Sequence, residues 1–341
     1  MQETVLTLGH SPDPDDAFMF YGLARGFIPT PGLQFQHVLQ DIQTLNERAL
    51  RGELDISAIS FAAYPAVCYH YALLPSGASM GDGYGPLVVA RRPYGRSDLL
   101  RLRLAVPGTL TSAFLALQLW LDRPAAELDY VVVPFDRIFE ALADGQADAG
   151  LLIHEGQLTY GQGGWQVCVD LGRWWSETQE GLPLPLGGNV IHKRHPEPLR
   201  RRVARVLTES IQYSLAHRPE ALEYALAFGR GLDRELADRF VGMYVNHWTL
   251  DYGERGRESD SPLTATGTPA RIPPPGPGSG VCDECLTLRS SRNPGLLVFR
   301  KRPNPGHKPA GTPKARTRPG PQSRQPGFGL HLPKARTPAR G

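Results

Sequence analysis

The chain has 341 residues, of which 41% are hydrophobic, so it is long enough for two ordinary domains with a sizeable core. Its net charge of +3 hides two opposite parts, because the residues after Glu258 include 14 of the 37 basic side chains but only 3 of the 34 acidic ones. The first 258 residues therefore have a net charge of −8 and the remainder +11, which argues against nucleic-acid binding by the first part.

The sequence shows no membrane segment and no secretory leader. No run approaches the roughly 18 apolar residues of a membrane span, and the opening MQETVLTLGH lacks both a basic and an apolar region. We therefore expect a cytoplasmic protein that does not contact membranes. Cys68 and Cys168 stand singly in apolar surroundings, which is typical of free buried cysteines rather than of a disulfide framework.

The first predicted strand, residues 4–9, ends in an acidic corner. The sequence SPDPDD at 11–16 follows this strand and leads into a predicted helix at 17–25. Acidic residues at a helix start usually complement the positive end of the helix dipole. We therefore expect the three aspartates of this corner to stabilise the helix rather than to take part in catalysis. They are Asp13, Asp15 and Asp16.

Two further strands end in similar corners. Residues 54–59 are followed by Ser60 and a predicted helix at 62–72, and residues 102–106 are followed by a turn, a cap at 109–112 and a predicted helix at 113–121. Each corner leaves unpaired N–H groups, a hydroxyl side chain and a positive dipole end, a combination that binds carboxylate or phosphate. Any one corner could simply cap its own helix. The three corners together favour one shared binding pocket.

An apolar run at residues 149–153 leads directly into His154. Such a run after a turn is typical of a buried parallel strand, and ligands bind just beyond the carboxyl ends of these strands. An imidazole titrates near neutral pH and can accept a proton there. We therefore predict that His154 is a general base, although it could instead only cap its strand. Glu155 and Tyr160 are candidates for orienting its ring.

The order of elements predicts two α/β domains. Glycine-led apolar segments at 85–92 and 186–194 bracket a block with its own strands near residues 102, 131, 149 and 166. We interpret the two segments as crossings between domains with a cleft and a hinge between them. The first domain would comprise residues 1–93 and 187–257, and the second residues 94–186. Predicted helices at 196–217, 219–230 and 233–249 would pack on the first domain.

The tail at 258–341 has a different composition. The residues after Glu258 include 16 of the 32 prolines, and the pentapeptide Pro-Lys-Ala-Arg-Thr occurs twice. A segment rich in Pro, Gly and Arg buries too little apolar surface to fold, so we expect disorder. Its CxxC pair, Cys282 and Cys285, has no second pair at zinc-site spacing. The tail could contact nucleic acid without sequence preference, or it could be the product of a frameshift.

Five segments occur in the order SPDPDDAFMFYGL, DIQTLNERALRGELDISAISFAAYP, GYGPLVVARRP, VPGTLTSAFL and GLLIHEGQLTY. Together they resemble the 1,4-dihydroxy-6-naphthoate synthase family of the futalosine route to menaquinone, over about residues 4–257. The resemblance implies a two-lobed type II periplasmic-binding-protein fold with a central cleft. It also implies a carbon–carbon lyase that converts cyclic dehypoxanthine futalosine to 1,4-dihydroxy-6-naphthoate without a metal or other cofactor. The family's further amphipathic helix after DYGERG is missing here.

The resemblance also implies a set of site residues. The proton-accepting histidine of the family corresponds to His154, and its substrate contacts correspond to Ala58, Ile59, Ser60, Ser112 and Ala113. The expected partner is a small carboxylate, and the sequence leaves the oligomeric state open. Two alternatives remain: a sister enzyme resembling chorismate dehydratase, or a cytosolic protein that binds a small carboxylate without chemistry.

Overall fold

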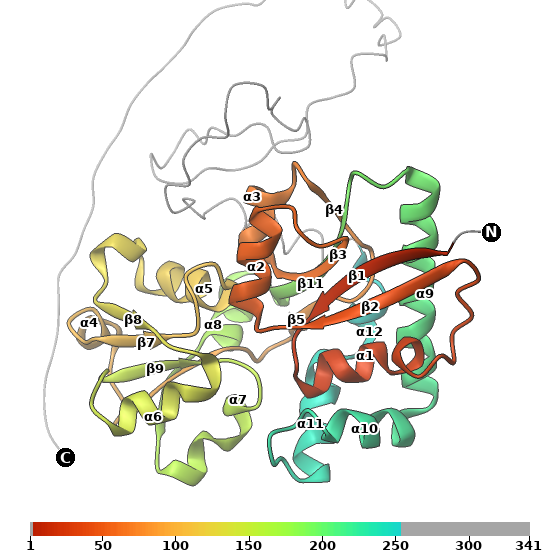
Figure 1. Cartoon of the computed structure of the whole chain (residues 1–341). Helices are drawn as coiled ribbons and strands as arrows, with labels where there is room; N and C mark the ends of the chain where they lie inside the picture. Colours follow the sequence, from red (N-terminus) through yellow and green to blue (C-terminus); the bar gives the residue numbers. More distant parts are fainter. Residues whose placement is uncertain (1–2, 254–341) are drawn as a thin grey trace, which may run out of the picture. The chain divides into compact units, whose positions relative to one another are not determined.

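The computed structural model describes residues 3–253, all of which belong to one compact unit. The predictions of a disordered or frameshifted tail at 258–341, of a cysteine pair at 282 and 285 and of non-specific nucleic-acid contact lie outside the described residues. Two sheets with their own helices form two lobes (Figure 1). Among residues 3–253, none of the helices combines the length and the hydropathy that a membrane crossing requires.

The first lobe is built on a six-stranded sheet. Its strands are β1 (Thr4–His10), β2 (Leu33–Leu39), β3 (Ile56–Ser60), β4 (Tyr71–Leu73), β5 (Ser79–Gly81) and β11 (Leu184–His192). The order is β2-β1-β3-β11-β4, and β5 also pairs with β11. β1 is parallel to β2 and β3, whereas β11 is antiparallel to all of its neighbours. The strand that returns from the second lobe therefore completes the first sheet.

The second lobe is built on a five-stranded sheet. Its strands are β6 (Leu87–Ala90), β7 (Leu104–Val106), β8 (Tyr130–Val132), β9 (Ala149–Leu152) and β10 (Gln166–Asp170). The order is β10-β6-β9-β7-β8, in which β7 is parallel to β8 and β9 and the pairs that include β6 are antiparallel. The sequence-based boundary at residue 93 therefore lies too late, because β6 pairs only within this second sheet. The return crossing likewise begins earlier than residue 187, since β11 starts at Leu184.

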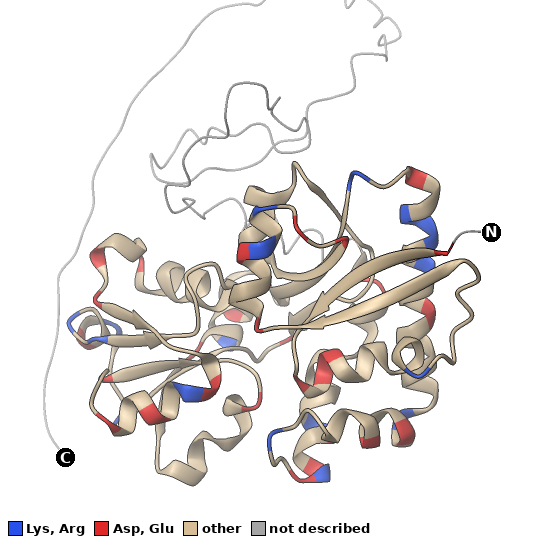
Figure 2. Cartoon of the chain, in the orientation of Figure 1, with Lys and Arg blue, Asp and Glu red and all other residues tan. Residues whose placement is uncertain are grey.

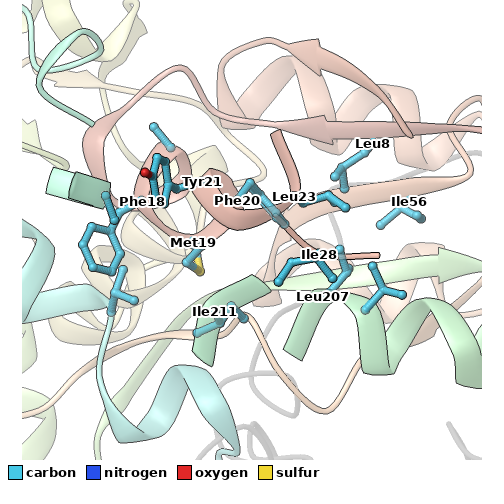
Figure 3. Packing of buried hydrophobic residues seen from close by; sticks show 14 of the residues in the cluster. Leu8, Phe18, Met19, Phe20, Tyr21, Leu23, Ile28, Ile56, Leu207 and Ile211 are labelled. Atoms are coloured by element: carbon cyan, nitrogen blue, oxygen red, sulfur yellow. The ribbon is translucent and has the colours of Figure 1, made fainter. Parts of the chain in front are cut away.

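Helices cover both faces of the first sheet. On one face lie α1 (Pro14–Ala24), α9 (Glu197–Ala216), α10 (Arg218–Leu226) and α11 (Arg234–Tyr244), which share one core with the sheet. Figure 3 shows Phe18, Met19 and Phe20 of α1 in this core. On the other face lie α2 (Ile42–Leu50), the short 3₁₀ turn η1 (Phe61–Ala63) and α3 (Tyr64–Val67). Figure 2 shows basic and acidic residues along α9 and α10 and few in the strands, and the buried positions of both helices hold no charged residue.

The second sheet is also buried on both faces. Alternate residues of β6 enter different cores: Val88 packs toward α5 (Ser112–Leu121) and α8 (Leu171–Thr178), and Val89 packs toward α6 (Ile138–Ala143). This alternation explains the continuous apolar sequence of β6. The remaining short elements of this lobe are α4 (Arg96–Leu99), η2 (Ala125–Glu127), η3 (Phe135–Arg137), α7 (Gly156–Thr159) and η4 (Tyr160–Gly163).

Two predicted helices are shorter than expected. The helix predicted at 62–72 ends at Val67, because Tyr71 begins β4, is fully buried and donates a hydrogen bond from its hydroxyl to the Leu54 carbonyl at 2.7 Å. The helix predicted at 233–249 is divided into α11 and α12 (His247–Leu250). Asn246 separates them, since its side chain accepts a hydrogen bond from the backbone N–H of Trp248 and caps α12.

Candidate active site

A cavity of about 110 Å³ lies between the two sheets and is lined by residues of both lobes. All six site positions expected from the sequence line it: Ala58, Ile59, Ser60, Ser112, Ala113 and His154. They come from the ends of β3 and β9 and from the first turn of α5. Much of the remaining lining is apolar, with Ile42, Pro86, Ile153 and Phe240 among its members. This combination of apolar walls and a few polar groups suits an aromatic ligand with polar substituents.

His154 follows β9 in a strained backbone conformation. Its φ of 53° lies in the left-handed region, which costs a residue other than glycine on the order of 1–3 kcal/mol. The ring is only 16% exposed, and its Nδ1 lies 3.0 Å from Oδ2 of Asp13. Its Nε2 is buried and has no hydrogen-bond partner among residues 3–253. His154 lines the cavity, and a fixed imidazole with one nitrogen beside a carboxylate and the other without a protein partner is arranged as a general base.

Asp13 is positioned by the start of α1. It is the N-cap residue, and its Oδ1 accepts a hydrogen bond from the backbone N–H of Asp16 at 3.3 Å, while Pro14 fixes the first helical position. Burial acts to raise the pKa of Asp13, but the neighbouring His154 and hydrogen-bond donors outweigh it and hold that pKa below its usual value. Asp13 is therefore ionised beside the imidazole.

The other two aspartates of this corner are buried as well. Asp15 is 7% exposed and Asp16 is 8% exposed, and both line the cavity. Burial, followed by the charge of Asp13, raises the pKa of each of them well above its usual value. Asp13 does cap α1, as expected, but acids that only complement a helix dipole are normally solvated, whereas these three are buried beside the cavity.

Glu155 and Tyr160 do not orient His154. Glu155 Oε1 pairs instead with Nη1 of Arg230 at 3.0 Å, and Tyr160 packs in the core on the α6 side of the second sheet. The ring that contacts His154 is Phe135, at a centroid distance of 4.5 Å. The Arg230 guanidinium lies 4.6 Å from the centroid of Phe135, and its Nη2 donates to the Pro12 carbonyl at 2.9 Å. Arg230 thus joins the acidic corner of the first lobe to the histidine loop of the second.

The hydroxyl groups at the other two corners are already engaged within the protein. Ser60 Oγ accepts from Nδ2 of Asn46 at 3.0 Å, and Asn46 Oδ1 accepts from the Ser60 N–H at 2.8 Å. Ser112 Oγ donates to the Leu186 carbonyl at 2.6 Å and accepts from the Ala62 N–H at 3.1 Å. Ser112 therefore fastens its corner to the corner after β3 with a fully used hydroxyl, whereas the Ser60 hydroxyl acts there only as an acceptor, for Asn46 of α2.

Free donors remain at the start of α5. Thr111 is the N-cap, and its hydroxyl accepts from the Phe114 N–H at 3.2 Å. The N–H groups of Ser112 and Ala113, in the first turn, have no carbonyl of the helix to bind. They belong to the positive end of the helix dipole, and both residues line the cavity. This helix start can receive a carboxylate oxygen. Asn189 adds an acceptor, because its Oδ1 is buried without a partner among residues 3–253 while its Nδ2 donates to the Gly77 carbonyl at 3.1 Å.

One group of side chains in the described part of the chain has the composition of a cation site. Asp13, Asp15 and His154 each offer a ligand atom, and these atoms lie within 4.8 Å of one another. A cation there would have to displace the contact between Asp13 and His154 and the proton that the raised pKa of Asp15 retains. The same atoms are arranged for proton transfer without such a displacement.

Sequence reasoning missed the residues that act at long range. Asp13 and His154 are 141 positions apart, Asn46 and Asn189 lie in segments that were noted for other reasons, and Phe135 lies outside every motif that drew notice. One signal was available. Three aspartates within four residues, next to two prolines and followed by the apolar segment AFMFYGL, leave little solvent-facing surface for so many charges.

The sequence matches a protein family described as menaquinone biosynthesis over residues 6–265. A 1,4-dihydroxy-6-naphthoate synthase from Thermus thermophilus is 41% identical over 272 residues, which are 80% of this chain and 97% of that protein. A 1,4-dihydroxy-6-naphthoate synthase from Streptomyces coelicolor is 36% identical over 259 residues, which are 75% of this chain and 90% of that protein.

Solved structures agree on the fold. A protein from Archaeoglobus fulgidus is 44% identical, with a TM-score of 0.72 over 76% of this chain and 95% of its own. The alkanesulfonate-binding protein from Xanthomonas axonopodis is 14% identical, with a TM-score of 0.55 over 72% of this chain and 85% of its own. At that identity the likeness shows the fold alone, which is the expected periplasmic-binding-protein fold.

Proposed function

Because this chain belongs to the menaquinone biosynthesis family and is a lyase like its curated relatives, we propose that it forms 1,4-dihydroxy-6-naphthoate from cyclic dehypoxanthine futalosine in the cavity between its lobes. The observation that supports the assignment of roles is the buried pair of Asp13 and His154 in the wall of a largely apolar cavity, in which Nε2 of His154 has no partner among residues 3–253. The substrate and the cytoplasmic location rest on the sequence resemblance.

His154 is the general base in this proposal. Its neutral ring accepts a proton from the substrate at Nε2, and Asp13 stabilises the imidazolium that forms through the contact at Nδ1. The strained backbone of His154 and its contact with Phe135 hold the ring in one orientation. A positioned base of this kind contributes roughly 10² to 10⁴ in rate.

The substrate carboxylate is placed at the start of α5. The N–H groups of Ser112 and Ala113 donate to it, while Ala58 and Ile59 contact the apolar part of the substrate from the opposite side. Ser112 contributes by fixing its corner, since its hydroxyl donates to the Leu186 carbonyl and accepts from the Ala62 N–H, and Ser60 is held in place by Asn46.

The test is turnover by His154→Ala. We expect kcat to fall by about 10² to 10⁴ while the binding constant for substrate changes only a few-fold. The matched control is His217→Ala, which removes an exposed histidine at the end of α9 and should leave kcat unchanged. Naphthoate absorbance and product mass measure turnover without added cofactor. Near-normal kcat in His154→Ala would remove the base assignment.

The same assay separates the two alternatives. A binding protein without chemistry would hold the substrate but form no product with wild-type protein, and a chorismate dehydratase would act on chorismate instead. A binding protein also has no use for a strained, buried histidine on a carboxylate. Product from cyclic dehypoxanthine futalosine, with none from chorismate, is the expected result.

A further inference from the structure

Asp15 has no role in the chemistry described so far, although it lies beside the base. It belongs to the first turn of α1 and lines the same cavity as His154. Its Oδ1 is buried and has no hydrogen-bond partner among residues 3–253. One carboxylate oxygen of Asp15 lies within 4.8 Å of ligand atoms of Asp13 and His154. The Asp15 side chain shares a hydrogen bond with Asp13, but its Oδ1 has no such partner in the described part of the chain. A buried polar atom without a protein partner, in a residue that lines a cavity, points to a ligand.

The charges around Asp15 favour its neutral form. Asp13 and Asp16 flank it on its own element, and His154 faces it from the second lobe. Tyr244 of α11 is the other titratable neighbour, and its hydroxyl donates to Gln157 at 2.7 Å. The nearby Arg230 forms an ion pair with Glu155. Among the described residues, His154 is the one basic side chain in ion-pair contact with any of the three aspartates.

Three carboxylates buried side by side cannot all be ionised, because each additional buried charge is costly and repels the others. Asp13, in contact with His154, is the ionised one, so Asp15 retains its proton. A neutral carboxyl group beside a general base is a proton donor next to a proton acceptor.

The proposed reaction requires both partners. We take the step to be a retro-aldol cleavage, in which a base removes the proton from a hydroxyl on one side of the carbon–carbon bond and the carbon that bears it becomes a carbonyl. The electron pair of the broken bond moves into the ring and onto a ring carbonyl oxygen, which must gain a proton to become the phenol. One proton leaves to the base and one arrives from an acid, so the step is balanced without an oxidant or reductant.

We propose that Asp15 is the general acid of this active site and protonates the oxygen that becomes a phenol as His154 accepts the other proton. This inference rests on the proposed function. After product release, the proton on the imidazole returns to the Asp15 carboxylate, directly or through water, and the site is reset. His154 and Asp15 therefore begin and end each cycle in the same protonation states.

The variant Asp15→Asn separates proton donation from a structural role. Asparagine has nearly the shape of the neutral acid and still donates hydrogen bonds, but it cannot transfer a proton. We expect kcat to fall by about 10² to 10⁴ with KM within a few-fold of wild type. The loss of kcat at high pH, where wild-type Asp15 ionises, should also disappear. A kcat within three-fold of wild type, or an unchanged alkaline limb, would overturn the assignment.

The matched control is Asp233→Asn at the start of α11. Asp233 is also an N-terminal aspartate of a helix, and its side chain accepts from the Leu236 N–H at 2.8 Å, which asparagine can reproduce. This variant should retain wild-type kcat. Circular dichroism and thermal unfolding verify that Asp15→Asn is folded.

A second measurement needs no substrate. The infrared difference spectrum between wild type and Asp15→Asn at pH 7 should contain the carbonyl band of a protonated carboxyl group. A carboxylate band in its place would overturn the proposal. If wild type forms no product, the proposed function fails; if wild type is active and Asp15→Asn is equally active, only the Asp15 assignment fails.

Discussion

Replacing Asp13 with asparagine removes the charge beside His154 while leaving the shape of the side chain nearly intact. Asp13 is 1% exposed, and its Oδ2 lies 3.0 Å from Nδ1 of His154. Two unit charges about 4 Å apart attract by about 4 kcal/mol at the effective dielectric constant near 20 that suits such sites. An amide that still accepts a hydrogen bond restores about 1–2 kcal/mol of this. The remaining loss of about 2–3 kcal/mol predicts a fall in kcat of about 30- to 150-fold.

Steady-state turnover of cyclic dehypoxanthine futalosine measures the effect, with kcat and KM determined separately. Because Asp13 acts through His154, the double variant Asp13→Asn, His154→Ala should be no slower than His154→Ala alone. Two results would refute the reasoning. One is wild-type kcat in Asp13→Asn, and the other is a double variant slowed by the product of the two single effects.

Three further predictions concern stability, geometry and metal. Burial would raise the pKa of Asp55, but hydrogen bonds from Thr7, Arg194 and His195 outweigh it and lower that pKa to about 2. The shift corresponds to a contribution of about 2 kcal/mol to the free energy of unfolding, or about 1 kcal/mol after solvent screening. This stability is present above pH 4 and lost as pH falls toward 2, so Asp55→Asn should lower Tm by about 2–4 °C at pH 7 and converge with wild type in acid melts. Gly77→Ala places a Cβ 2.1 Å from Nδ2 of Asn189 at a φ of 83°, whereas the control Gly83→Ala has a similar φ of 75° but open space around its Cβ. Thermal unfolding should therefore show a loss of stability for Gly77→Ala that is larger by at least about 1 kcal/mol, and this variant should also have a raised KM. Turnover should be unchanged after dialysis against EDTA, and lost activity that zinc or magnesium restores would contradict proton chemistry at Asp13, Asp15 and His154.

Local sequence patterns identify the corners of the site but not what meets there. His154 could be found because an apolar run ends at it, Ser60 because it stands between a strand and a helical segment, and Ser112 because it begins a helix shortly after a strand. The partner of the imidazole could not be predicted from the sequence, since the contact between Asp13 and His154 depends on how the two lobes pack against each other. The same covering turns the acidic corner from a solvated helix start into a buried cluster.

The errors in the fold have equally specific causes. The sequence of β6 is apolar on both faces, so periodicity alone cannot say which of two sheets it joins. The segment after Ser60 has a helical pattern, but Tyr71 is extended in β4, where its buried hydroxyl donates to the Leu54 carbonyl. In both cases a tertiary contact decides between structures that the local sequence permits equally.

The position of β11 has a consequence for the order in which the protein is assembled on the ribosome. The strands of the second sheet are contiguous in the sequence, from Leu87 to Asp170, so this sheet can close as soon as that stretch has emerged. The first sheet cannot close at that point, because β11 lies between β3 and β4 and pairs with both of them. This strand is synthesised about a hundred residues after β4. A nascent chain stalled before Leu184 therefore exposes the unpaired edges of β3 and β4, the kind of surface that chaperones bind and that aggregates form upon.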